Sequence, residues 1–199
     1  MASSEVAICN MAIGRIGGSI FIDSLTEASQ QASVCNLFYE ACRDLALSAF
    51  DWNFARTRVV LADLGTPPTN WLYRYAIPTD CLTARFVVVE GARTPAAKDR
   101  IPFEVASEGD VLVLYTDLEE AELVYTRRMT NPNLFSASFV MALSWLIASE
   151  IALPLSAAPG LGERAFKMYN LAISQSVTAS MNEAQEDVEP DSEFISGRN

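Results

Sequence analysis

The stretch Asp51-Trp52-Asn53-Phe54-Ala55 separates two kinds of sequence, and the predicted fold follows from it. Before it, apolar residues recur at helical spacing over residues 6–16 and 32–46. After it, as far as Arg128, short runs rich in β-branched and aromatic residues alternate with turn residues, which is typical of antiparallel strands. The stretch therefore marks a change from helix to sheet, and we expect Trp52 to pin the sheet region onto the helices.

Helical periodicity returns after Thr130-Asn131-Pro132-Asn133, a sequence that stops a strand and caps a helix. The most apolar segment, from Phe139 to Leu153, is too short to span a bilayer and contains Glu150, so it predicts a buried helix. We expect Pro154 to end this helix. A last helix is predicted from about Gly160 to Met181.

These elements predict an α+β fold, namely a four-helix bundle of two N-terminal and two C-terminal helices with an inserted small antiparallel β-lobe and an acidic C-terminal tail. The tail has six acidic residues and one arginine, and it is expected to be flexible or ordered on assembly. The predicted units are an N-terminal helix pair in residues 1–50, a β-rich insertion in 51–129, a C-terminal helix pair in 130–182 and the tail in 183–199.

The net charge of −11 argues against sequence-specific nucleic-acid binding, because an acidic surface repels phosphates. It does not prevent DNA from sliding through a channel without sticking. The N-terminal residues lack the basic start and apolar run of a signal peptide. We therefore expect a soluble protein made in the cytoplasm, without a membrane partner.

The sequence contains no histidine, so neither a Ser-His-Asp nor a Cys-His catalytic arrangement can form. The four cysteines lack metal-ligand spacing and are expected to be buried thiols in a reducing cytosol. Gly14-Arg15-Ile16-Gly17-Gly18 lacks the Lys-Ser/Thr of a phosphate loop, so we expect it to end a helix. We predict no enzyme, no cofactor and no metal site. A carboxylate-dependent hydrolase is the weakest alternative, with these candidate acids: Asp51, Asp63, Asp80, Glu104 and Asp110.

Six motifs follow one another along the chain: Ile8-Cys9-Asn10-Met11-Ala12-Ile13-Gly14-Arg15-Ile16-Gly17, Ile22-Asp23-Ser24-Leu25, Tyr39-Glu40-Ala41-Cys42-Arg43-Asp44, Asp51-Trp52-Asn53-Phe54-Ala55, Tyr73-Arg74-Tyr75-Ala76-Ile77-Pro78-Thr79-Asp80-Cys81-Leu82 and Asn131-Pro132-Asn133-Leu134-Phe135. In order and spacing they resemble the head-to-tail adaptor family of short-tailed bacteriophages, the tail tubular protein A group. That family has a short helix ending in glycine, a long helix ending in R-[DE], a W-x-F-A segment and a Y-x-[LIV]-P-x-D-x-L strand and turn. The resemblance covers most of residues 5–155.

The resemblance implies a structural connector at the head–tail junction of a virion. Its copies would form a ring of about twelve subunits between the portal protein and the tail nozzle protein. DNA would pass through the centre of the ring without sequence-specific binding. The helices would pack around the ring, and the β-lobe would face neighbouring tail components.

Six residues are candidate partner contacts: Arg127, Arg128, Glu186, Asp187, Phe194 and Ile195. The two arginines are adjacent, so on a strand their side chains point to opposite faces, and one of them is expected to pair with a neighbour's acid. The tail residues are expected to dock on the portal or on a neighbouring subunit. From the residues alone, a small cytoplasmic protein-interaction module unrelated to phage stays open as the main alternative.

Overall fold

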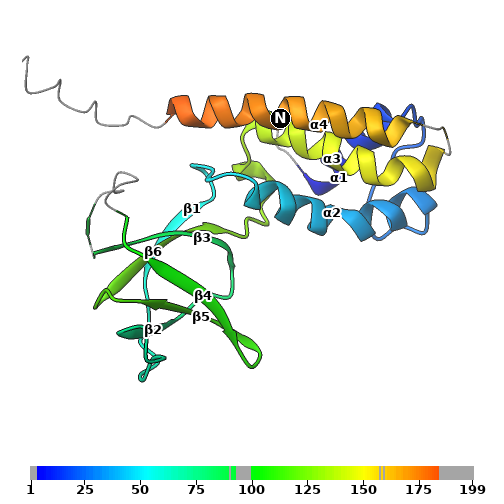
Figure 1. Cartoon of the computed structure of the whole chain (residues 1–199). Coiled ribbons are helices and arrows are strands. Elements are labelled where there is room, and N and C mark those ends of the chain that lie inside the picture. The colour runs from blue at the N-terminus through cyan, green and yellow to red at the C-terminus, as the bar shows by residue number, and fades with distance from the viewer. Residues whose placement is uncertain (1–3, 90, 93–99, 157, 159, 184–199) are drawn as a thin grey trace, which may run out of the picture.

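The computed structural model describes residues 4–89, 91–92, 100–156, 158 and 160–183. It has a helical unit and a β unit that lie side by side (Figure 1). The helical unit consists of α1 (Glu5–Arg15), α2 (Gln30–Ser48), α3 (Ala137–Ser156) and α4 (Leu161–Glu183). The β unit consists of β1 (Arg56–Val60), β2 (Tyr73–Ala76), β3 (Cys81–Val89), β4 (Phe103–Glu108), β5 (Val111–Thr116) and β6 (Ala121–Arg127). A short 3-10 helix, η2 (Pro132–Leu134), leads from the sheets back to the helices.

The helix α3 is the centre of the helical unit. It packs against α1, α2 and α4, because its sequence is apolar on nearly every side. Its length and composition alone would also suit a membrane span, but more than half of it is buried inside the protein. The prediction of a buried helix is therefore confirmed. The helix continues to Ser156 rather than ending before Pro154, since the proline lies exposed in the last turn, where a lost hydrogen bond costs little.

The six strands form two antiparallel sheets, with the orders β1-β6-β3 and β2-β5-β4. In the first sheet Leu123 of β6 lies opposite Val59 of β1 and Val87 of β3. In the second, Leu114 of β5 lies opposite Tyr75 and Val105. The two sheets share one apolar core, whose buried members are Leu61, Tyr75, Val87, Leu114, Ala121, Leu123 and Tyr125.

The predicted four-helix bundle with a small β-lobe is wrong. The fold is α+β, but three helices surround a central one, and the β unit is two three-stranded sheets with a core of their own. The reason is visible in β3, where Phe86, Val87 and Val88 are buried in succession. Val87 faces the core between the sheets, whereas Phe86 and Val88 pack with Val124 on the other face. Burial on both faces removes the simple alternation that would have identified the partner sheet.

Candidate partner-binding surface

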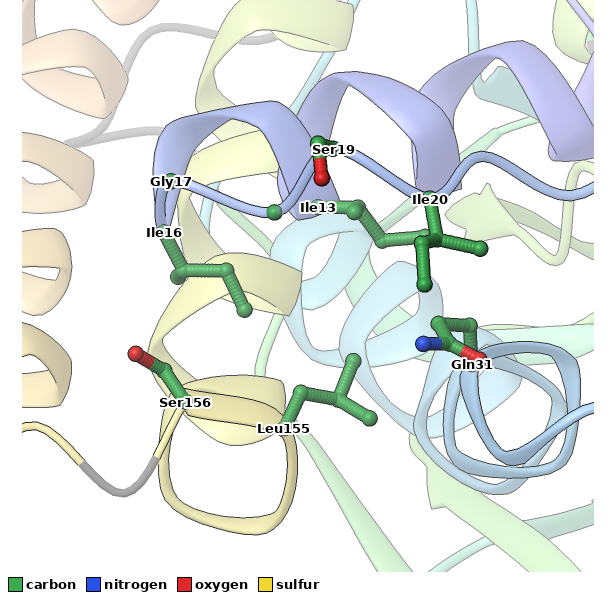
Figure 2. Close-up of a pocket in the computed structure, with 9 residues that line it drawn as sticks. Ile13, Ile16, Gly17, Ser19, Ile20, Gln31, Leu155 and Ser156 are labelled. Carbon is green, nitrogen blue, oxygen red and sulfur yellow. The ribbon is translucent and has the colours of Figure 1, made fainter.

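The end of the helical unit that lies away from the sheets contains a cavity of about 310 Å³. It lies between the loop after α1, the start of α2 and the end of α3. Figure 2 shows Ile16, Ile20 and Leu155 pointing toward one another across it, with Gln31 and Ser156 at its edge. The lining includes no charged side chain but combines apolar residues with Ser19, Gln31 and Ser156, so the cavity suits a neutral, partly polar group of a partner better than an ion.

Ile20 lines this cavity and is itself exposed, and two more exposed apolar side chains belong to the same segments, Phe21 in the loop and Leu153 near the end of α3. Ile20 is 63% exposed, Phe21 57% and Leu153 83%. Large apolar residues grouped on one surface of a protein mark a site of interaction with another macromolecule. We call the adjacent pair Ile20 and Phe21 together with the cavity the distal apolar end.

The loop that presents Ile20 and Phe21 is held in place from both sides. Asn10 on α1 accepts a hydrogen bond from the backbone N–H of Ile22 at 2.8 Å and donates one to the Ile22 carbonyl at 2.9 Å. At the end of α1, Gly17 has a φ of +79°, and a Cβ on Gly18 would lie 2.6 Å from the side chain of Ile13. The prediction that the glycines end the helix is thus confirmed. The conformation of the loop is fixed by these contacts.

A second hydrogen-bond cluster joins this loop to α2. The Glu27 carboxylate accepts from the Ser29 hydroxyl at 2.7 Å and from the backbone N–H groups of Asp23 and Ser24 at 2.8 and 3.2 Å. The same hydroxyl caps α2 by accepting from the backbone N–H of Ala32 at 3.1 Å. These hydrogen bonds hold the pKa of Glu27 below its ordinary value, and the bond from Ser29 has the largest effect.

Replacing Glu27 with glutamine should lower the thermal unfolding midpoint at neutral pH. A carboxyl whose pKa is lower in the folded state contributes stability above its unfolded pKa, here near 4.5, and loses it as the pH falls through the folded value. The difference in thermal unfolding midpoint between wild type and Glu27→Gln should therefore be present at about pH 7 and shrink toward about pH 3. Melting curves at both pH values check this, with Glu40→Gln as the control for an exposed acid on α2. A difference that stays constant across the range would contradict it.

The candidate residues Arg127 and Arg128 lie where the two units meet, and both engage acids of their own chain. Arg127 Nε lies 2.8 Å from an Asp80 carboxylate oxygen, and the Tyr125 hydroxyl donates to the other at 3.0 Å. Arg128 Nε lies 2.9 Å from Asp44 on α2. The two side chains thus reach different acids. A further contact of either arginine with a partner's acid stays a prediction.

Another arginine at this junction, Arg85 of β3, was not singled out from the sequence. Its guanidinium donates to the carbonyls of Ser48 and Phe50, at 3.1 and 2.6 Å, and to the hydroxyl of the buried Thr126 at 2.8 Å. It therefore caps the C-terminal end of α2 from the sheet and complements the partial negative charge there. Among sequence signals, only an arginine in an otherwise apolar strand could have pointed to it.

Replacing Arg85 with methionine should lower the free energy of unfolding by about 1.5–3 kcal/mol, the range for hydrogen bonds to a charged group. Methionine keeps an unbranched side chain and removes all three hydrogen bonds. The matched control is Arg127→Met, which breaks an ion pair between half-exposed groups and should cost less than about 1 kcal/mol. Urea denaturation of both variants measures the difference. Equal costs would mean that Arg85 does not hold the junction.

The remaining chemistry-bearing residues of the described chain are dispersed. All four cysteines are free thiols; burial raises the pKa of Cys42 to about 12 and that of Cys81 to about 11, so neither is a reactive thiolate at neutral pH. No group of three potential metal ligands occurs among the described residues. Four of the candidate acids have local partners: Asp51 pairs with Arg56, Asp80 pairs with Arg127, Asp63 accepts from the backbone N–H of Gly65, and Glu104 accepts from Trp71.

Four of the predicted contact residues, Glu186, Asp187, Phe194 and Ile195, lie outside the described residues. The sequence alone did not identify the residues of the distal apolar end as a candidate site. The signal available was the pair Ile20-Phe21, two large apolar residues in a connector between helices. The sequence matches no protein-family model and no curated protein.

Proposed function

We propose that the chain is a structural head-to-tail adaptor of a short-tailed bacteriophage, joining the portal protein to the tail nozzle protein. The observation that supports this best is the distal apolar end. An exposed apolar surface around a cavity without charged lining is suited to docking on another protein and offers no group for chemistry on a substrate.

The arrangement of the chain suits a part that connects two others. Gln31 lines the distal cavity, and Ser48 at the other end of α2 receives the hydrogen bond from Arg85. At about 1.5 Å per residue the two points are about 25 Å apart along the helix. The distal apolar end and the β unit therefore lie at separate places on one firmly joined chain. In the proposal the distal apolar end faces the portal, and the β unit faces the tail.

The charge of the chain fits a DNA channel. With a net charge of −11, a ring of such subunits would repel DNA phosphates overall and let DNA pass without sequence-specific binding. The same charge makes the subunits repel one another. We therefore expect a ring to close only when the subunits are bound to the portal. Spontaneous closed rings at low salt would contradict that part. The protein would be made in the host cytoplasm and end in the virion.

The same apolar end would also serve a small cytoplasmic interaction module, which is the second candidate. Electron microscopy separates the two. Portal rings of short-tailed phages, mixed with the purified chain, should gain a second layer of density with the symmetry of the portal. Portals that keep their shape and size would contradict the adaptor proposal and favour the interaction module.

A further inference from the structure

An apolar groove lies on the β unit, where the chain leaves β1 and crosses to the second sheet. Its volume is about 210 Å³, and all of its lining residues are apolar; they come from residues 59–62 and from residues 76–78. Val60 of this lining is 49% exposed. A cavity of about 150 Å³ accommodates a benzene ring, so the groove has room for one phenylalanine side chain. We call it the β1 groove.

The β1 groove lies beside an open sheet edge. The strand β1 is at the edge of its sheet, whose order is β1-β6-β3. The Leu61 N–H donates to the Ala121 carbonyl of β6 at 2.9 Å. Since backbone groups alternate in direction along a strand, the N–H and C=O of Val60 point away from β6. An extended segment can therefore lie along this edge and place a side chain in the groove.

The C-terminal segment 184–199 begins close to this edge. Asn53, three residues before β1, donates from its side-chain amide to the Ser180 carbonyl at 2.7 Å, which holds the last turn of α4 near the start of β1 (Figure 1). From Asn53 to Val60 an extended chain covers about 23 Å. The eleven residues from Glu183 to Phe194 can cover up to about 36 Å. Phe194 can therefore reach the β1 groove of its own chain.

The charge of the segment complements that of β1. Residues 184–193 contain five acidic residues, and the whole chain carries −11. Residues 56–100, which include β1, instead carry +3, because they contain seven basic and four acidic residues. Arg56 and Arg58 lie on one side of β1, on the way from α4 to the β1 groove. Each faces one carboxylate of the fold, at 2.8 and 3.8 Å, but a guanidinium has five N–H donors and can bind a second carboxylate as well.

Covalent attachment favours the chain's own segment as the occupant of the β1 groove. One aromatic side chain in an open groove, with ion pairs near the surface, makes only a weak contact between separate molecules. A short linker raises the effective concentration of an attached group to the millimolar range. The same weak contact is therefore occupied when both halves belong to one chain.

We infer that the segment 184–199 docks on the β unit of its own chain, with Phe194 in the β1 groove and the acidic residues beside Arg56 and Arg58. This docking is a property of the chain before assembly and does not depend on the proposed function. Phe194 and Ile195 are also predicted portal contacts. Their release from the β1 groove would then precede attachment to the portal, and that step alone rests on the proposed function.

The first test compares NMR spectra of the full-length wild type and of Phe194→Asp in dilute solution. Loss of docking should shift the backbone amide signals of Val60 and Ile77 and leave that of Val105, on the second sheet, unchanged. The matched control is Val188→Asp, which adds the same charge to the segment and should leave all three signals in place. Raising the salt from about 0.05 M to about 0.5 M should move the wild-type signals toward those of Phe194→Asp, because salt screens the contacts with the arginines.

The second test changes the groove instead of the segment. Val60→Asp places a carboxylate where the acidic segment docks, so the amide signal of Phe194 should move to its position in a synthetic peptide of residues 184–199. The variant should keep its fold because Val60 is half exposed. Val105→Asp is the matched control, at a valine 42% exposed on β4, the edge strand of the other sheet, and it should leave the Phe194 signal unchanged.

Three results would overturn the inference. The first is that wild type and Phe194→Asp have the same Val60 and Ile77 signals. The second is that these signals differ only at high protein concentration, which would assign the segment to a neighbouring copy. The third is that they differ only after portal rings are added, which would assign the segment to the portal. Failure of portal attachment with docking intact in the unassembled chain would count against the proposed function instead.

Discussion

Replacing Trp52 with alanine should lower the free energy of unfolding by about 3–5 kcal/mol, the range for truncating a fully buried aromatic side chain. Trp52 is completely buried, and its ring packs edge-on against Phe50 and Phe139 and stacks on Phe54. Its indole N–H donates to the Ala46 carbonyl at 3.0 Å. The substitution leaves a cavity and also removes the partner of a carbonyl near the end of α2.

Urea denaturation measures this loss, and Trp71→Ala is the matched control. Trp71 is half-buried on the β unit and donates to the exposed Glu104, so its truncation should cost about 1 kcal/mol. Unfolding of Trp52→Ala at nearly the wild-type urea concentration would contradict the role of Trp52 as a packing centre of the helical core.

The second large effect concerns partner binding. A double variant, Ile20→Asp with Phe21→Asp, should weaken attachment to the portal by about a hundredfold or more. Each side chain, once buried at an interface, contributes on the order of 1.5–3 kcal/mol, and about 1.4 kcal/mol corresponds to a tenfold change. The variant should keep its fold, because both side chains are more than half exposed in the free chain.

A matched pair of residues provides the control. Val111 and Leu112 are also adjacent, apolar and exposed, at 59% and 53%, but they lie on β5 in the β unit. Changing both to aspartate should leave portal attachment unchanged. Biolayer interferometry with immobilised portal rings compares the two variants. Equal losses would show that any pair of new charges disturbs attachment, and the distal apolar end would lose its role.

The sequence predicted the individual helices and strands better than it predicted how they are arranged in space. The strand-like runs predicted between Asp51 and Arg128 became strands, and the helix stop at Gly17-Gly18 and the buried helix around α3 were confirmed. These features depend on neighbours along the chain, such as caps, turn residues and periodicity. The division of the strands into two sheets depends on contacts between segments that are distant in the sequence. Because β3 is buried on both faces, its residues do not alternate in a way that indicates those contacts.

The candidate site was predictable only in part, for a similar reason. Arg127 and Arg128 could be singled out as adjacent charges, but their partners Asp80 and Asp44 are far from them in the sequence. Ile20 lines a cavity only because Leu155 and Ser156, from the end of α3, lie opposite the loop that contains it. Apolar residues that are exposed look like core residues until the fold is known.

The measurement that tests the adaptor proposal most directly is mass photometry of the purified chain, alone and mixed with portal rings of short-tailed phages. The dilute chain should be a monomer near 21.8 kDa. With portals it should give one discrete higher mass, corresponding to a fixed number of added subunits that matches the symmetry of the portal. A monomer that leaves the mass of every portal unchanged would contradict the proposal.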